Sequence, residues 1–177
     1  KCVSSKSGNT FLIVDMPFST FQKNPEETFS HAAKLMDSGA QMVKLEGGVW
    51  LLETIEFLTT RGVPVCTHLG MLPQSINKIG CYRKFGSSEQ EKDLLIKTAT
   101  SLQNAGSELL ILELVNSSTS KQITEVLKIP TVGIGSGKFV DGQVLVLYDI
   151  LGIGSKLSFT KDFLSESNSI EDCVKNY

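Results

Sequence analysis

Five ionisable residues of this sequence are spaced in a way that could do chemistry, because each lies in or at the end of a short apolar run. They are Asp15, Lys44, Glu46, His68 and Glu113. Lys44 and Glu46 are two residues apart, so on a strand both side chains point to the same face. One interpretation is a salt bridge on a half-buried strand, which adds little to stability. The other is a strand end that delivers a cation and a carboxylate to a site.

Two of these residues offer oxygen ligands for a hard metal ion. Asp15 and Glu46 are carboxylates at what we expect to be neighbouring strand ends. Mg²⁺ sites typically use one or two carboxylates and leave the other positions to substrate and water. The lysine beside them suits an anionic substrate. These residue types therefore predict a Mg²⁺ site that binds an acid.

Glu113 and His68 are candidates for the remaining chemistry. Glu113 lies in the apolar run ELLILEL, where a carboxylate is desolvated unless it is paired, so it could be a general base or part of an internal ion pair. His68 could bind a metal, hydrogen-bond a substrate, or be a satisfied buried side chain. Gly133, Gly135 and Gly137 resemble a phosphate-binding loop, but their spacing differs from G-x-G-x-x-G and the signal is weak.

The elements that must position these side chains alternate short apolar runs with amphipathic stretches, the pattern of repeated βα units around a parallel sheet. The runs are nearly unbroken in hydrophobicity, as expected for strands covered on both faces. Strands are predicted within residues 10–18, 41–47, 63–70, 108–114 and 129–137. Helices are predicted between them, over residues 24–40, 50–62, 88–106 and 118–129. The first helix has Asn24 as its expected N-cap and Pro25 at its first position.

The order of these elements limits the fold class. A helix follows each strand, which leaves an open doubly wound sheet or a (β/α)8 barrel. The polar strand ends favour the barrel, because a barrel gathers them around one axis whereas an open sheet leaves some at its edges. A complete barrel takes about 250 residues, at about 30 per unit, so this chain of 177 residues is roughly two units short. We therefore predict an α/β fold, an incomplete (β/α)8 TIM-type barrel, with residues 1–177 as a single partial barrel domain.

Composition excludes several classes of protein. The chain is 41% hydrophobic and 20% charged, which fits one globular domain with a sizeable core rather than a disordered chain. Its net charge of -2 and its scattered basic residues indicate no nucleic-acid partner, and no apolar run approaches the ~20 residues of a membrane span. The cysteines have no metal-binding spacing, so we expect reduced thiols and a cytoplasmic location. They are Cys2, Cys66, Cys81 and Cys173.

Six segments occur in the order and at the spacing of a known family: DMPF, VKLEGG, HLGMLPQS, LELV, IPTVGIGSG and DGQVLVLYDILG. With these motifs the chain resembles ketopantoate hydroxymethyltransferase, also called 3-methyl-2-oxobutanoate hydroxymethyltransferase, over nearly its whole length. The resemblance implies a (β/α)8 barrel with Mg²⁺ as cofactor. It also implies transfer of a hydroxymethyl group from 5,10-methylenetetrahydrofolate to 2-oxoisovalerate (3-methyl-2-oxobutanoate), which gives ketopantoate in pantothenate biosynthesis.

On matching positions, the resemblance implies a role for each of the five candidates. Asp15 and Glu46 would hold the metal, and Glu113 would be the catalytic base. Lys44, Asp15 and His68 would bind the substrate. The complete enzyme would be a homo-oligomer that acts on small molecules, with neither nucleic acid nor membrane as a partner.

The chain departs from the family pattern at its amino end. The family's first two strands carry AYD and VGDS motifs that this sequence lacks, so we expect the chain to begin near the third strand. Expressed alone, it should lack transferase activity and fold poorly. Two alternatives stay open. The chain could be a truncated, non-catalytic remnant of this enzyme, or another Mg²⁺-dependent aldolase or lyase of the phosphoenolpyruvate/isocitrate lyase barrel group.

Overall fold

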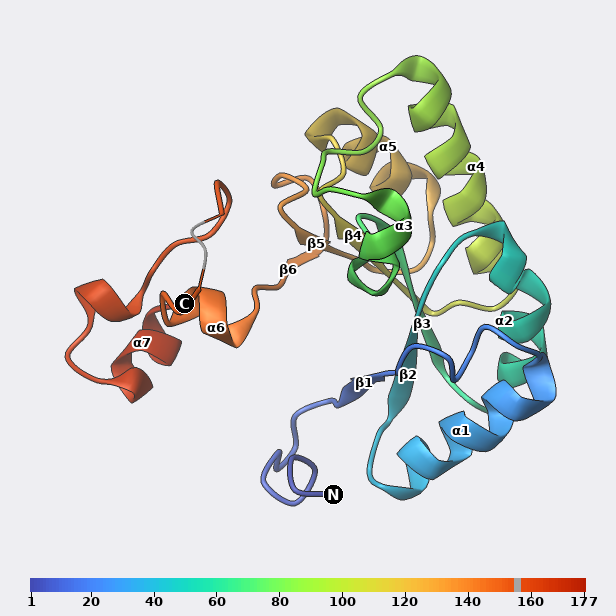
Figure 1. The fold of residues 1–177 in the computed structure, drawn as a ribbon, viewed down its shortest axis with the longest axis horizontal. Helices are drawn as coiled ribbons and strands as arrows, with labels where there is room; N and C mark the ends of the chain where they lie inside the picture. The colour runs from blue at the N-terminus through green and yellow to red at the C-terminus, as the bar shows by residue number, and fades with distance from the viewer. Residues whose placement is uncertain (155–156) are drawn as a thin grey trace.

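The computed structural model describes residues 1–154 and 157–177, and its centre is a sheet of six parallel strands (Figure 1). The strands are β1 (Ile13–Asp15), β2 (Met42–Glu46), β3 (Val65–Gly70), β4 (Leu109–Glu113), β5 (Thr131–Ile134) and β6 (Gly142–Gln143). Each strand lies beside the one that follows it in the chain. A doubly wound sheet reverses its strand order at a switch point. The consecutive order therefore excludes that alternative and confirms the incomplete barrel.

The larger helices follow the strands in the same order. They are α1 (Pro25–Asp37), α2 (Leu52–Thr59), α4 (Glu89–Asn104) and α5 (Ser117–Val126). They contact one another in turn, α1 with α2, α2 with α4 and α4 with α5, as a row of barrel helices does (Figure 1). The predicted helices and the first five strands are thus confirmed. Within the described residues, none of the helices combines the length and apolar character that crossing a bilayer requires.

The start of α1 shows how local sequence places a helix end. The side chain of Asn24 accepts a hydrogen bond from the backbone N–H of Glu27 at 2.8 Å. Pro25 occupies the first helical position, where a missing N–H costs no helical hydrogen bond. Glu26 and Glu27 place negative charge near the positive end of the helix dipole. The N-cap predicted at Asn24 is therefore confirmed.

The main apolar core lies between the sheet and these helices. Val43 and Leu45 of β2 and Leu110 and Leu112 of β4 point into it and are fully buried. Side chains alternate along a strand, so the residues between them, such as Lys44, point to the opposite side of the sheet. We call that side the inner face. The apolar core thus packs on one side of the sheet, and the polar side chains of the strands, such as Lys44, lie on the inner face.

Several short elements were not predicted. They are the strand β6, the helices α3 (Ile76–Ile79), α6 (Leu147–Ile150) and α7 (Ile170–Asn176), and the 3-10 helices η1 (Val49–Leu51), η2 (Pro73–Ser75) and η3 (Leu164–Glu166). α6 and α7 lie beyond the β6 end of the sheet, apart from the large helices (Figure 1). There the buried Cys173 thiol donates to the carbonyl of Ile150 at 3.5 Å. These elements are too short to show a clear hydrophobic period.

Candidate functional site

The five predicted site residues come together on the inner face, at the carboxyl ends of β1 to β4. Asp15 of β1 pairs in register with Lys44 of β2, and Glu46 pairs with His68 of β3. The register partner of Glu113 lies two residues beyond His68 on the same strand. Residues two apart on a strand share a face, and register partners on adjacent parallel strands do too. The register therefore gathers all five side chains on one face.

Lys44 is the centre of the cluster. Its Nζ is 2.5 Å from Oδ1 of Asp15 and 3.5 Å from Oε1 of Glu46. The same ammonium group lies 3.2 Å from Nδ1 of His68. The Lys44 side chain is only 12% exposed, so these charges interact in a less polar medium than surface ion pairs do. The predicted salt bridge between Lys44 and Glu46 is present, and it lies on the inner face with His68.

The two carboxylates beside Lys44 differ in their access to solvent. The Asp15 side chain is 59% exposed, whereas that of Glu46 is 5% exposed. The second oxygen of Glu46, Oε2, accepts a hydrogen bond from the backbone N–H of Gln74 at 3.0 Å. Glu46 is therefore held at both oxygens, while Asp15 is open to a ligand that enters from solvent.

Glu113 and His68 form the other half of the cluster. Oε2 of Glu113 lies 3.4 Å from Nε2 of His68, and the Glu113 side chain is 12% exposed. Among the described residues, Nε2 of His68 has no hydrogen-bond partner. A carboxylate that is shielded from bulk water but reachable by a ligand is suited to accept a proton. The geometry thus brings the predicted base next to the predicted site histidine.

Cys66 adjoins the cluster but takes no part in such chemistry. It is the register partner of Lys44 on β3 and is fully buried. Burial raises the pKa of its thiol to about 12, and the nearby Lys44 charge only partly opposes this effect. The thiolate is the form that attacks electrophiles and binds metals, so Cys66 is inert at neutral pH.

Asp15 and Glu46 are the residues that could hold a metal ion. Within residues 1–154 and 157–177, no three His, Cys, Asp or Glu side chains form a group able to hold one. Both carboxylates nevertheless lie near one positive charge, that of Lys44. Two negative charges against one positive charge make the space beside Asp15 and Glu46 favourable for a cation. Two carboxylates completed by substrate and water are a donor set that Mg²⁺ uses. The donors fit Mg²⁺ in type, and the metal assignment stays a prediction.

Gln74 is a site residue that was not predicted from the sequence. Besides its contact with Glu46, its side-chain amide donates to the carbonyl of Met16 at 3.0 Å. It therefore ties the loop after β3 to the segment that follows Asp15. The motif HLGMLPQS contains a signal for this role, because Pro73 begins η2 and Gln74 follows it in the first turn. The first N–H groups of a helix lack partners within it, so the N–H of Gln74 is free to bind a carboxylate.

Gly70 lets β3 and β4 approach closely beside the site. Its φ is +93°, and a Cβ there would collide with the backbone carbonyl of Glu113. We expect Gly70→Ala to lower the free energy of unfolding by about 2 kcal/mol or more, through backbone strain and overpacking. Gly62→Ala is the matched control, because Gly62 has a φ of +83° but open space around it. Urea unfolding of both variants measures the difference, and equal losses would contradict the collision.

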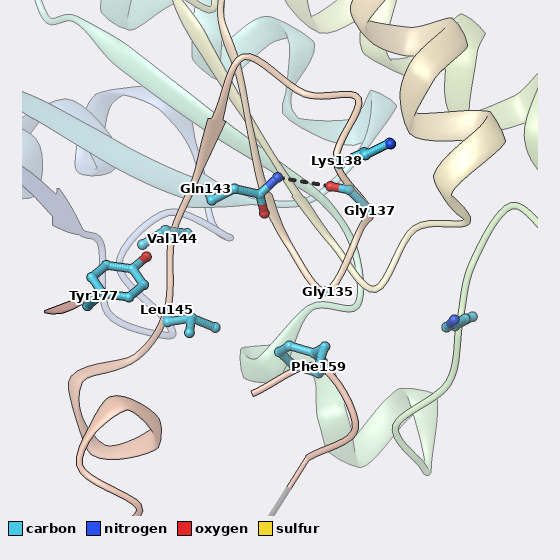
Figure 2. A pocket seen from close by; sticks show the side chains of 9 residues that line it. Gly135, Gly137, Lys138, Gln143, Val144, Leu145, Phe159 and Tyr177 are labelled. Atoms are coloured by element: carbon cyan, nitrogen blue, oxygen red, sulfur yellow. Dashed lines mark hydrogen bonds between the residues drawn. The ribbon is translucent and has the colours of Figure 1, made fainter. Parts of the chain in front are cut away.

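The glycine-rich segment after β5 borders a cavity of about 500 Å³ (Figure 2). The side chain of Gln143 donates to the carbonyl of Gly137 at 2.9 Å, as the dashed line in Figure 2 shows. Phe159 packs so closely on Gly135 that a Cβ would need its ring to shift. The cavity is lined by Lys84, Gly135, Gly137, Lys138, Gln143, Val144, Leu145, Phe159 and Tyr177. Aromatic and aliphatic walls with lysines suit a flat ligand that carries negative charge.

Comparisons with known proteins find relatives over nearly the full chain. The family model for ketopantoate hydroxymethyltransferase matches residues 1–177. A 3-methyl-2-oxobutanoate hydroxymethyltransferase from Nitrosospira multiformis is 49% identical over 178 residues, which cover 99% of this chain and 68% of the relative. A protein of the same name from Idiomarina loihiensis is 50% identical over 179 residues, which cover 100% of this chain and 67% of the relative.

A solved structure bears on the fold alone. A candidate phosphonomutase from Burkholderia cenocepacia superposes with a TM-score of 0.51 at 14% sequence identity. The superposition covers 71% of this chain and 55% of that chain. At this level of identity the similarity agrees with the incomplete α/β barrel and carries no statement about chemistry.

Proposed function

Because the chain belongs to the ketopantoate hydroxymethyltransferase family, we propose that it binds 2-oxoisovalerate and carries the proton-transfer site of a 3-methyl-2-oxobutanoate hydroxymethyltransferase. In that reaction a hydroxymethyl group passes from 5,10-methylenetetrahydrofolate to 2-oxoisovalerate, which gives ketopantoate for pantothenate biosynthesis. The observation that carries the proposal is the inner-face cluster, in which a shielded Lys44 contacts two carboxylates and His68 while Glu113 lies beside that histidine.

Lys44 supplies the binding charge in this proposal. Its ammonium lies on the inner face beside Asp15, the exposed carboxylate of the cluster. A 2-oxo acid that enters there can pair its carboxylate with Lys44 as the lysine shifts away from Asp15. When held by Asp15 and Glu46, Mg²⁺ would supply Lewis-acid polarisation of the 2-oxo group, which acidifies the neighbouring C–H.

Glu113 receives the proton. The C3 proton of the substrate moves to a carboxylate oxygen of Glu113, and the C–H electron pair stays on the substrate as its enolate. The nucleophilic carbon then forms a C–C bond with the one-carbon unit of the folate. Both C–N bonds that hold this unit break, and a water molecule supplies the hydroxyl group of the product. The proton from C3 and the second proton of the water pass to the two folate nitrogens, which releases tetrahydrofolate. The protein's contribution to this step is orientation of the two reactants.

The folate co-substrate is proposed to occupy the cavity of Figure 2. Ile134, the register partner of Glu113, directly precedes Gly135 at the cavity wall. The cavity therefore begins beside the proposed base. The ring of Phe159 suits a flat heterocycle, and Lys84 and Lys138 suit the carboxylates of a glutamate tail.

The experiment that tests the proposed function follows the C3 proton of 2-oxoisovalerate in D₂O with Mg²⁺. The protein containing this chain is expected to exchange that proton without folate and to form ketopantoate when folate is added. A remnant without catalysis would do neither. A lyase or aldolase of the related barrels would instead cleave a phosphorylated or four-carbon acid, and either outcome would overturn the proposal.

Replacing Lys44 tests the binding role. We expect Lys44→Met to weaken binding of the 2-oxo acid by about tenfold, the loss of one hydrogen bond to a charged group. Turnover at saturating substrate should change less, because a carboxylate contact serves the ground state as well as the transition state. The measurement is KM against kcat.

The matched control for this variant is Lys92→Met. Lys92 is a half-buried lysine on α4 that pairs with Glu89, away from the inner face. It should leave both constants unchanged. A loss of turnover in Lys44→Met at unchanged affinity would show that Lys44 does not bind the acid.

A further inference from the structure

The ring of His68 lies between the two halves of the site. His68 is 3% exposed, so water does not satisfy its ring nitrogens. Nδ1 faces Nζ of Lys44 at 3.2 Å and Oε1 of Glu46 at 3.8 Å. Nε2 faces Oε2 of Glu113 at 3.4 Å. Each nitrogen therefore has its own neighbours, and the position of the ring proton decides which hydrogen bonds can form.

The contact with Lys44 determines which ring nitrogen of His68 carries the proton. An ammonium group has three donors and no acceptor, so its contact with Nδ1 requires Nδ1 to accept. A neutral imidazole that accepts at one nitrogen carries its proton on the other. The alternative, an N–H at Nδ1, would set two donors against each other, and Glu46 at 3.8 Å is beyond hydrogen-bond distance. The ring proton therefore belongs on Nε2.

This arrangement leaves a buried donor beside the base. Nε2 has no hydrogen-bond partner among the described residues, and buried polar groups left unpaired are costly. Oε2 of Glu113 lies 3.4 Å away, and a rotation of its carboxylate toward the N–H would form the bond. A hydrogen bond there would hold one oxygen of Glu113 and leave the other free.

We propose that Lys44 holds His68 as its Nε2–H tautomer, and that this N–H orients the Glu113 carboxylate for proton transfer. His68 is then a positioning residue. Side-chain contacts connect the proposed metal ligand Asp15 to the proposed base Glu113. They run from Asp15 to Lys44, from Lys44 to His68 and from His68 to Glu113. The inference deepens the proposed function, since it rests on Glu113 as the base, but the tautomer itself can be measured without any substrate.

The first test is long-range ¹⁵N–¹H NMR of the protein containing this chain, labelled at histidine. The chain has only two histidines, and His31 on α1 serves as the internal reference. We expect the His68 proton on Nε2. In Lys44→Met the proton should shift toward Nδ1, where Glu46 becomes the acceptor, whereas Lys44→Arg keeps donors and should keep the tautomer. A proton on Nδ1 in the unchanged chain, or no response to Lys44→Met, would overturn the proposal.

The second test separates orientation from mere packing. In the protein containing this chain, His68→Leu should slow C3-proton exchange of 2-oxoisovalerate by about tenfold, whereas His68→Gln, which keeps an N–H donor, should restore most of the rate. The rates are compared at saturating 2-oxoisovalerate, so that any contact of His68 with the acid itself does not affect the comparison. Equal losses in both variants would overturn the positioning role. If Glu113→Gln left exchange unchanged, the proposed function would fail while the tautomer result still stood.

Discussion

Replacing Glu113 by glutamine is expected to slow exchange of the C3 proton of 2-oxoisovalerate with solvent by about 10²- to 10⁴-fold, the contribution typical of a general base. An amide has the shape of the carboxylate but cannot accept the proton at neutral pH. Glu113 lies at the carboxyl end of β4 and points to the inner face, away from the apolar core, so the change leaves that core intact. Binding of Mg²⁺ and of the acid should persist. Deuterium incorporation followed by NMR measures the effect.

The control for this variant is Glu108→Gln. Glu108 directly precedes β4 at its opposite end and is exposed, so the same change of charge should leave exchange at its original rate. Unaltered deuterium incorporation in Glu113→Gln would place the base elsewhere. A general fall in both variants would indicate a loss of net charge or stability instead of a lost base.

Asp15→Asn is expected to lower Mg²⁺-dependent turnover by about 100-fold or more, because loss of groups that merely support metal ligands already costs 10- to 100-fold. Asp15 is the more exposed of the two carboxylates and thus the one a metal ion reaches from solvent. An amide oxygen is neutral and binds Mg²⁺ less strongly than a carboxylate. The measurement is turnover as a function of Mg²⁺ concentration.

Asp37→Asn is the matched control, since Asp37 is an exposed carboxylate at the end of α1. It should keep both the rate and its Mg²⁺ dependence. Normal activity of Asp15→Asn at ordinary Mg²⁺ concentrations would remove Asp15 from the metal site. Recovery only at high Mg²⁺ would support its role, because a weakened site is filled by mass action.

Much of the fold could be predicted from sequence, because the local sequence pattern of each larger strand and helix agrees with the structure it adopts. The alternation in QMVKLEGG assigned Lys44 and Glu46 to one face, and the structure places both on the inner face. The motif NPEE predicted the start of α1 at Asn24, and its cap is formed. Polar strand ends favoured the barrel over the doubly wound sheet, which the consecutive strand order confirms.

The details of the site could not be predicted, because they depend on the register between strands. No pattern in the sequence indicates that Lys44 contacts Asp15, Glu46 and His68 at once. Gln74 was missed for the same reason, since its bonds cross from the loop after β3 to other strands. β6 pairs over only two residues, too few for a periodic signal.

The spread of the site over four strands has a consequence for ligand affinity. β1 pairs with β2 over three residues, whereas β3 pairs with β4 over five. Asp15 of β1 and Glu113 of β4 lie at opposite ends of the cluster. A ligand that contacts both binds only the molecules in which the strands from β1 to β4 are docked together, so its apparent affinity falls with that populated fraction. Such a ligand in turn stabilises the paired sheet by mass action.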